Sequence, residues 1–168
     1  MEAAAPYWRE AYGLAWALTG DRGRAEELAQ EAFVRLGTMK REPDATRPLR
    51  ELLLAIVRNL ALDELRRQGA SSLDEAMDGG ASFADASSPD PAAEVQARER
   101  RERLREALDT LSPTWRATLY LRDGLSLSYR QIAEVLERSE DVVRVTLHRA
   151  RLSLRELVEA RIAGGEPS

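Results

Sequence analysis

Apolar residues recur at spacings of three and four along most of this chain, which predicts amphipathic helices. No segment alternates apolar and polar residues with the period of two that a half-buried strand requires. The first helical stripe runs from Tyr7 to Leu18, and Gly20 is expected to end that helix. Asp21 can cap a second helix, whose apolar face extends from Ala25 to Leu36. The pattern therefore predicts an all-α fold.

A third helix follows an interruption of this pattern. Two prolines break the periodicity between Met39 and Pro48, and Thr46 is a candidate capping residue within that stretch. From Leu49 to Leu65 the apolar positions resume at helical spacing. We therefore expect the chain to begin with a unit of three or four helices.

A change in composition then divides the chain. From Gly69 to about Pro91 the residues are mostly Ala, Ser, Gly, Asp and Pro, without a helical or strand period. This predicts two small helical domains, a first unit over residues 1–68 and a second unit over residues 93–162, joined by an acidic flexible linker over residues 69–92. Each unit is close to the lower size limit for an independent core, so support from a partner is expected.

The second unit begins with two helices of different character. A strongly charged helix is expected from Val95 to Leu111, and its run from Arg98 to Arg105 is typical of a solvated helix face. Ser112 and Pro113 provide a capping residue and a first-turn proline for the next helix, which is expected to end near Gly124.

A helix-turn-helix pattern follows. Ser128 and Gln131 can form a capping box for a short helix from Tyr129 to Leu136. After the pair Glu137-Arg138, Ser139 can cap a longer helix. The inner stripe of that helix consists of Val143, Leu147, Ala150 and Leu154, and its opposite face carries Arg144, His148, Arg149, Arg151 and Arg155. A short helix, a tight turn and a longer helix with a basic outer face predict DNA binding.

The acidic net charge does not contradict that prediction, because the excess acid is local. The chain carries 25 Lys and Arg against 29 Asp and Glu, a formal net charge of −4. Residues 68–97 hold six acids and no base, namely Asp74, Glu75, Asp78, Asp85, Asp90 and Glu94. Residues 98–168 hold 14 bases and 12 acids. The second unit is therefore net basic although the whole chain is acidic.

Catalysis has no candidate site in the sequence. The chain has no cysteine and one histidine, His148, so we expect no thiolate, disulfide or histidine-based metal site. Glu26, Glu27 and Glu31 have no partner set for acid–base work and are better explained as a solvated helix face. The longest strongly apolar run, Leu52 to Val57, is far shorter than the roughly 20 residues of a membrane span. With no evident signal peptide, we expect a cytoplasmic protein that is not an enzyme and has no cofactor, small-molecule substrate or membrane insertion.

Both units carry longer motifs. In the first unit they are AEELAQEAFVRL, from Ala25 to Leu36, and IVRNLALDELRR, from Ile56 to Arg67. In the second unit they run from LSPTWRATLYLRDGLS through SYRQIAEVL to VVRVTLHRARLSLREL, ending at Leu157. In this order and at this spacing, the motifs resemble bacterial RNA polymerase sigma factors of the extracytoplasmic-function (ECF) type over nearly the whole chain.

The resemblance implies that the first unit binds polymerase and the −10 promoter element. The segment from Glu27 to Leu36 would dock on the coiled coil of the polymerase β′ clamp, and the loop from Met39 to Pro48 would capture an extruded base. The residues implied in core polymerase binding are Glu27, Gln30 and Glu31, with Phe33 as core support. Those implied in −10 DNA binding are Arg58, Asn59, Asp63, Arg66 and Arg67.

For the second unit the resemblance implies recognition of the −35 element. Bases would be read in the major groove by Arg144, His148 and Arg149. Phosphates would be held by Arg122, Tyr129, Arg130, Ser139 and Arg151. The implied partners are core RNA polymerase, through its β′ clamp and β flap, promoter DNA and an anti-sigma factor.

The sequence departs from the family pattern at several positions. Leu52 stands where tryptophan usually precedes leucine. The turn holds Glu137 and Arg138 where glycine and an apolar residue are usual. In the second helix of the motif, Val142 replaces a common threonine and Thr146 an often basic residue. These departures leave the expected fold intact and bear on promoter sequence and phosphate contacts.

Two alternative functions stay open. A free-standing helix-turn-helix repressor or activator would bind duplex DNA as a dimer, although the linker and the motifs of the first unit argue against it. An interaction module that sequesters a regulator would bind no DNA, and the unusual turn is the only hint of it. The acidic linker is itself open to two interpretations, a segment that follows a positively charged RNA path and a solubilising spacer.

Overall fold

The computed structural model describes residues 2–39, 47–69 and 91–164, and within these ranges every regular element is a helix. The elements are η1 (Glu2–Tyr7), α1 (Trp8–Thr19), α2 (Arg22–Thr38), α3 (Leu49–Arg67), α4 (Pro91–Asp109), α5 (Pro113–Leu119), η2 (Tyr120–Gly124), α6 (Tyr129–Leu136) and α7 (Glu140–Gly164). The predicted all-α fold is confirmed. Thr46, most of the loop from Met39 to Pro48 and most of the acidic linker lie outside the described residues.

The capping signals of the first unit act as predicted. Gly20 adopts a left-handed conformation with φ of 73°, and its N–H donates to the Trp16 carbonyl, which ends α1. The Asp21 carboxylate accepts a hydrogen bond of 2.9 Å from the Arg24 N–H and so starts α2. The residue immediately before α3 is Pro48, which makes no side-chain cap.

The caps of the second unit are also confirmed. The Ser112 hydroxyl accepts from the Trp115 N–H, and Ser128 with Gln131 forms the complete capping box of α6. The charged helix predicted from Val95 begins earlier, at Pro91. The helix predicted to reach Gly124 is α5 followed by the π-helical turn η2.

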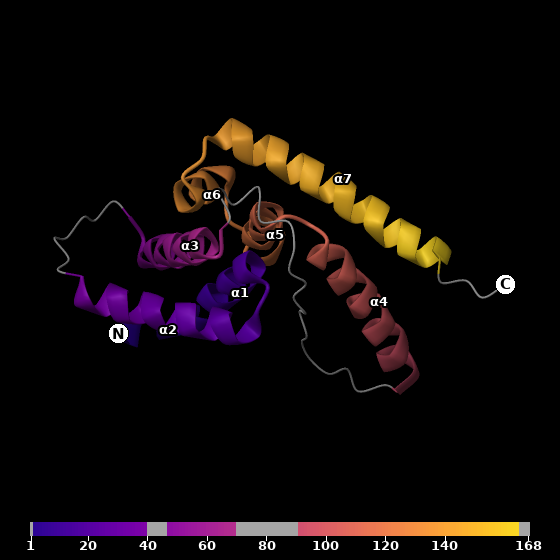
Figure 1. Cartoon of the computed structure of the whole chain (residues 1–168), viewed down its shortest axis with the longest axis horizontal. Helices are drawn as coiled ribbons and strands as arrows, with labels where there is room; N and C mark the ends of the chain where they lie inside the picture. Colours follow the sequence, from indigo (N-terminus) through magenta and orange to yellow (C-terminus); the bar gives the residue numbers. More distant parts are fainter. Residues whose placement is uncertain (1, 40–46, 70–90, 165–168) are drawn as a thin grey trace.

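The two units pack directly against each other (Figure 1). Helix α5 contacts both α1 and α7, and α6 contacts both α3 and α7. The largest hydrophobic core therefore draws on both units, including Leu14, Leu18, Leu53, Val57, Leu121, Ile132 and Val135. Full burial of one such leucine or valine contributes roughly 1.5–3 kcal/mol. A second, smaller core lies under α7 and consists of Leu111, Leu119, Leu147 and Ala150.

Candidate nucleic-acid interface

The turn between α6 and α7 is tight and is formed without glycine. Glu137 is left-handed, with φ of 52° and ψ of 49°, a conformation that glycine adopts more readily. The Arg138 N–H donates to the Ala133 carbonyl across the turn. The Ser139 hydroxyl then accepts from the Val142 N–H, which confirms the predicted cap of α7. The helix-turn-helix geometry is thus built by local hydrogen bonds.

Helix α7 buries three of the four residues of its predicted inner stripe, leaves Leu154 half-buried, and exposes its basic face. Val143, Leu147 and Ala150 are buried in the two cores. The residues predicted to read bases, Arg144, His148 and Arg149, are all exposed. Their side chains are therefore available to a DNA groove without any rearrangement of the helix.

The two predicted base-reading arginines lie on different flanks of α7. The Arg144 guanidinium lies 5.1 Å from the centre of the Tyr129 ring on α6 and 3.1 Å from the Asp141 carboxylate. Arg149 instead lines a hollow beside α5, together with Trp115 and Thr118. Five residues along a helix turn the side chain through about 500°, so the two arginines point well apart.

Most of the predicted phosphate-binding residues meet around Tyr129. The Arg122 guanidinium lies 4.8 Å from the centre of the Tyr129 ring, which Arg144 also contacts, and it donates to the Leu127 carbonyl at 2.8 Å. Arg151 pairs with Asp123, and this hydrogen-bonded pair raises the pKa of Arg151. The structure brings Arg122, Tyr129, Arg144 and Arg151 into one basic cluster.

The remaining two predicted phosphate-binding residues lie outside this cluster. Arg130 pairs with Glu134 along α6, and Ser139 is engaged as the cap of α7. Both side chains are exposed and remain close to the helix-turn-helix surface.

The predicted −10 residues on α3 divide into one buried and four exposed. Arg58 is only 8% exposed, and it donates to Glu137 and to Asn59, both at 2.8 Å. Asn59, Asp63, Arg66 and Arg67 are exposed. The Arg58 guanidinium is thus held against the turn of the other unit instead of facing solvent with its neighbours.

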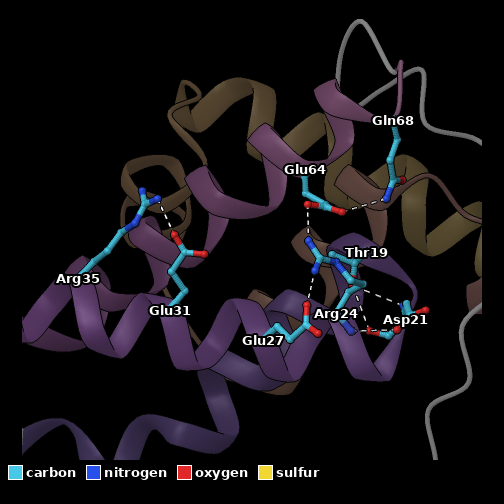
Figure 2. Close-up of polar contacts among 8 residues, drawn as sticks. All are labelled: Thr19, Asp21, Arg24, Glu27, Glu31, Arg35, Glu64 and Gln68. Atoms are coloured by element: carbon cyan, nitrogen blue, oxygen red, sulfur yellow. Dashed lines mark hydrogen bonds and ion pairs between the residues drawn. The ribbon is translucent and has the colours of Figure 1, made fainter.

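The predicted polymerase-docking residues are all exposed on α2, and Figure 2 shows two of them, Glu27 and Glu31, on the same side of the helix. Glu27 pairs with Arg24, which reaches across to Glu64 on α3 at 2.5 Å. Glu31 pairs with Arg35 at 2.6 Å. Gln30 lies between them in sequence and is also exposed.

Sequence reasoning missed an apolar residue on the same face. Val34 follows Gln30 by four positions and is 58% exposed, although it lies within the motif of the second helix. The sequence did carry a signal, because Val34 stands four residues after Gln30 and therefore falls on the polar face of the helix. Val34 adds an apolar side chain to the exposed face that carries Glu27, Gln30 and Glu31.

Neither a metal site nor a membrane span emerges from the described residues. Within residues 2–39, 47–69 and 91–164, no three His, Asp or Glu side chains gather closely enough to hold a metal ion. Among the helices of the same ranges, none is long and apolar enough to cross a membrane.

Two family profiles match the chain, one in each unit. Residues 5–71 match sigma-70 region 2, and residues 101–154 match sigma-70 region 4. These matches cover α1 to α3 and most of α4 to α7.

Curated relatives of the chain include several ECF sigma factors. The chain is 34% identical over 165 residues to SigL of Mycobacterium tuberculosis, which covers 93% of this chain and 86% of SigL. It is 33% identical over 165 residues to SigE of Mycolicibacterium smegmatis, which covers 92% of this chain and 63% of SigE. The probable sigma factor SigI of M. tuberculosis is 33% identical over 162 residues, and 53% of its length is covered. The chain thus spans little more than half of some relatives.

Solved structures share the fold. Sigma factor RpoE from Bartonella quintana, in complex with the anti-sigma factor NepR, aligns with a TM-score of 0.73 over 94% of this chain and 95% of that chain, at 20% identity. The sigma factor SigJ of M. tuberculosis aligns with a TM-score of 0.56 over 99% of this chain and 60% of that chain, at 27% identity.

Proposed function

Because the chain belongs to the ECF family of RNA polymerase sigma factors, we propose that it binds core RNA polymerase and directs it to promoters, where it melts the −10 element and starts transcription. In this proposal the first unit, residues 1–68, acts as sigma region 2, and the second unit, residues 93–162, acts as region 4. Residues 69–92 connect them. Sigma factors are non-catalytic subunits, and the cytoplasm is where this one would act.

One observation carries the proposal. A region 2 match and a region 4 match occur in one chain. In the region 4 part, the turn after α6 leads into α7, whose basic face is exposed. A free-standing helix-turn-helix regulator would account for α7 alone. It would leave the region 2 unit and its exposed α2 face without a function.

The exposed face of α2 supports a polymerase contact. Glu27, Gln30, Glu31 and Val34 combine two carboxylates, an amide and an apolar side chain on one helix surface. We assign this face to the β′ clamp coiled coil and the second unit to the β flap. An anti-sigma factor is proposed as a further partner, as B. quintana RpoE has NepR.

Assembly with polymerase tests the proposal directly. Gel filtration with core RNA polymerase should move the protein into the polymerase peak, and the mixture should produce promoter-dependent transcripts whose 5′ ends define the promoters. A free-standing regulator would bind duplex DNA without polymerase and support no transcript. Absence of both the shared peak and the transcript would overturn the proposal.

A paired substitution tests the docking face. Glu27→Lys combined with Gln30→Ala should weaken binding to core polymerase by about tenfold, because a charge is reversed at the centre of the contact. Helix content, followed by circular dichroism, should not change. Glu26→Lys makes the same charge reversal at an exposed neighbour on α2 and is the matched control. Equal affinities for the double variant and the control would remove Glu27 and Gln30 from the contact.

A further inference from the structure

The two units share one hydrophobic core. Helices α1 and α3 contribute one side, and α5, η2 and α6 contribute the other. At its edge the Tyr120 ring of η2 lies over Gly13 of α1, so closely that a Cβ atom on Gly13 would overlap the ring. This fit requires glycine at position 13.

Polar contacts cross the same surface. The buried Arg116 guanidinium donates to the Ala17 carbonyl at the end of α1, at 2.8 Å. Gln131 donates to the Glu51 carboxylate at 2.5 Å, and Glu51 is only 4% exposed. Arg50 pairs with Glu10 at 2.6 Å and also donates to the Leu125 carbonyl at 3.1 Å. Buried polar groups that find their partners across this surface favour one relative arrangement of the two units, in addition to the apolar burial.

The pair of Arg58 and Glu137 differs from these contacts, because each residue also belongs to a proposed DNA-binding element. Arg58 lies on the −10 helix α3, and Glu137 forms the turn of the helix-turn-helix. The Nε atom of Arg58 is buried and has no hydrogen-bond partner among the described residues. The Glu137 side chain of this ion pair is 66% exposed, so another anion can reach the pair from solvent.

Promoter geometry is incompatible with this packing. Two promoter elements two duplex turns apart are separated by about 70 Å, whereas α3 and α6 touch each other in the structure. From these observations we propose that Arg58 and Glu137 form a charge latch in a closed, self-masked state, and that Arg58 must leave Glu137 before α3 can bind the −10 strand. The DNA role of α3 rests on the proposed function, whereas closure itself does not.

The masking is one-sided. The base-reading face of α7 stays exposed in the closed state, and only the −10 helix loses a predicted contact. The free protein should therefore bind a −35 duplex without opening and bind a −10 single strand only in its open fraction. The apparent affinity for the strand is reduced by that fraction.

Closure can be measured on the full chain without DNA. Because the chain has no cysteine, Arg9→Cys and Asp123→Cys place one dye on each unit at exposed positions for energy transfer, and the Arg9 carbonyl lies 3.4 Å from the hydroxyl of Tyr120, three residues before Asp123. Wild type should show high transfer. Gly13→Ala should raise the open-to-closed ratio by about tenfold, since the added methyl displaces Tyr120. Gly23→Ala, on the exposed side of α2, is the matched control and should leave transfer unchanged.

The latch itself is tested in the Gly13→Ala background, where both states are populated. Glu137→Gln should raise the open-to-closed ratio by a further two- to fivefold, about the effect expected for a partly exposed ion pair. Glu134→Gln removes the same charge from an exposed pair internal to α6 and should not change the ratio. Equal shifts for the two glutamate variants, or low energy transfer in wild type, would overturn the latch.

DNA binding separates this inference from the proposed function. With a non-template −10 oligonucleotide from a mapped promoter, affinity should rise in Gly13→Ala by the same factor as the open fraction. Affinity for the −35 duplex should stay within about twofold. An open variant that binds the duplex normally and the strand no better than wild type would overturn the masking. If no variant binds either DNA, the promoter role fails, while energy transfer still decides closure.

Discussion

The two helices proposed to meet DNA, α3 and α7, lie in contrasting surroundings. Helix α3 packs against α1 and α2 on one side and against α6 of the other unit on the other. Helix α7 uses one stripe for packing and leaves its basic face free. In the closed state that we propose, the helix assigned to the −35 element is accessible to DNA, whereas one residue assigned to the −10 element, Arg58, is occupied by a contact within the protein. The two helices therefore differ in how accessible they are to DNA, with α7 more accessible than α3.

The largest effects are expected from truncating two buried leucines. Leu121 lies in the core that both units share, and Leu147 lies in the smaller core under α7. Leu121→Ala and Leu147→Ala should each lower the free energy of unfolding by about 2–5 kcal/mol, through lost transfer energy and a residual cavity. Both side chains are almost fully buried. Denaturant unfolding followed by circular dichroism measures this loss.

Hydrogen exchange should then distinguish the two leucine variants. Leu121→Ala should lower amide protection in α1 and α3 as well as in η2 and α6, because its core joins both units. Leu147→Ala should lower it in α4, α5 and α7 and leave α1 and α3 protected. If Leu121→Ala leaves α1 and α3 as protected as in wild type, the shared core does not couple the units.

Local signals made much of this fold predictable. Gly20, Asp21, Ser112, Ser128 and Ser139 mark helix ends through hydrogen bonds with residues a few positions away, and such contacts depend on short stretches of sequence. The resemblance to a known family then supplied candidate site residues. Their exposure on α2 and α7 agrees with a role in binding.

The contact between the units was not predictable in the same way. Arg58, Glu51 and Arg116 occupy helical positions that sequence patterns treat as polar, yet all three are buried. Their burial depends on surfaces that are brought together from opposite ends of the chain, such as Arg58 against Glu137 and Arg116 against Ala17. The spacing of apolar residues indicates a helix and its faces, but it does not indicate which second helix covers a polar position.

The free face of α7 should carry base recognition. Arg144→Ala should cost about 1–3 kcal/mol at one base-pair position if its guanidinium forks onto a guanine, and Arg149→Ala should do the same at another position. The two arginines lie on different flanks of the helix, so their effects should map to separate bases. Selection of −35 variants from a randomised pool provides the measurement.

Arg122→Ala is the contrasting variant for base recognition. Arg122 stacks on Tyr129 within the basic cluster, so its loss should weaken all sequences alike and flatten the salt dependence. Unchanged sequence preference in both Arg144→Ala and Arg149→Ala would show that α7 does not read bases through these residues.

Alkaline pH should loosen the contact between the units while sparing α7. Burial, with Glu10 nearby, raises the pKa of Tyr120 from 10.0 to about 12. An exposed tyrosine ionises first as pH rises, so the stabilisation is intact below pH 10 and is lost towards pH 12. The closed state should lose about 1–2 kcal/mol across this window.

Energy transfer between the two dyes, titrated against phenolate absorbance, measures this loss. Tyr120→Phe cannot ionise and should keep high transfer to a higher pH than wild type. The Tyr120 hydroxyl donates to carbonyls of Arg9 and Glu10 only at 3.4 Å, so its removal costs little at neutral pH. Identical pH profiles for the two proteins would exclude Tyr120 as the titrating group.

The smallest effect should come from an ion pair of α7 that corresponds to the Arg58–Glu137 pair of α3. Arg151 pairs with Asp123 of its own unit, and both side chains are about half exposed, at 46% and 49%. Such a pair contributes about 0.2–1 kcal/mol, so a DNA phosphate can displace Asp123 from Arg151. Asp123→Asn should strengthen binding to any duplex by up to about fivefold and steepen the salt dependence by at most about one phosphate contact. Glu159→Gln, an exposed acid near the other end of α7, is the control for the change in net charge. Fluorescence anisotropy over a series of salt concentrations measures both quantities. If Asp123→Asn changed −10 strand binding as strongly as duplex binding, the two arginines would not belong to separately controlled surfaces, and the contrast between α3 and α7 would fail.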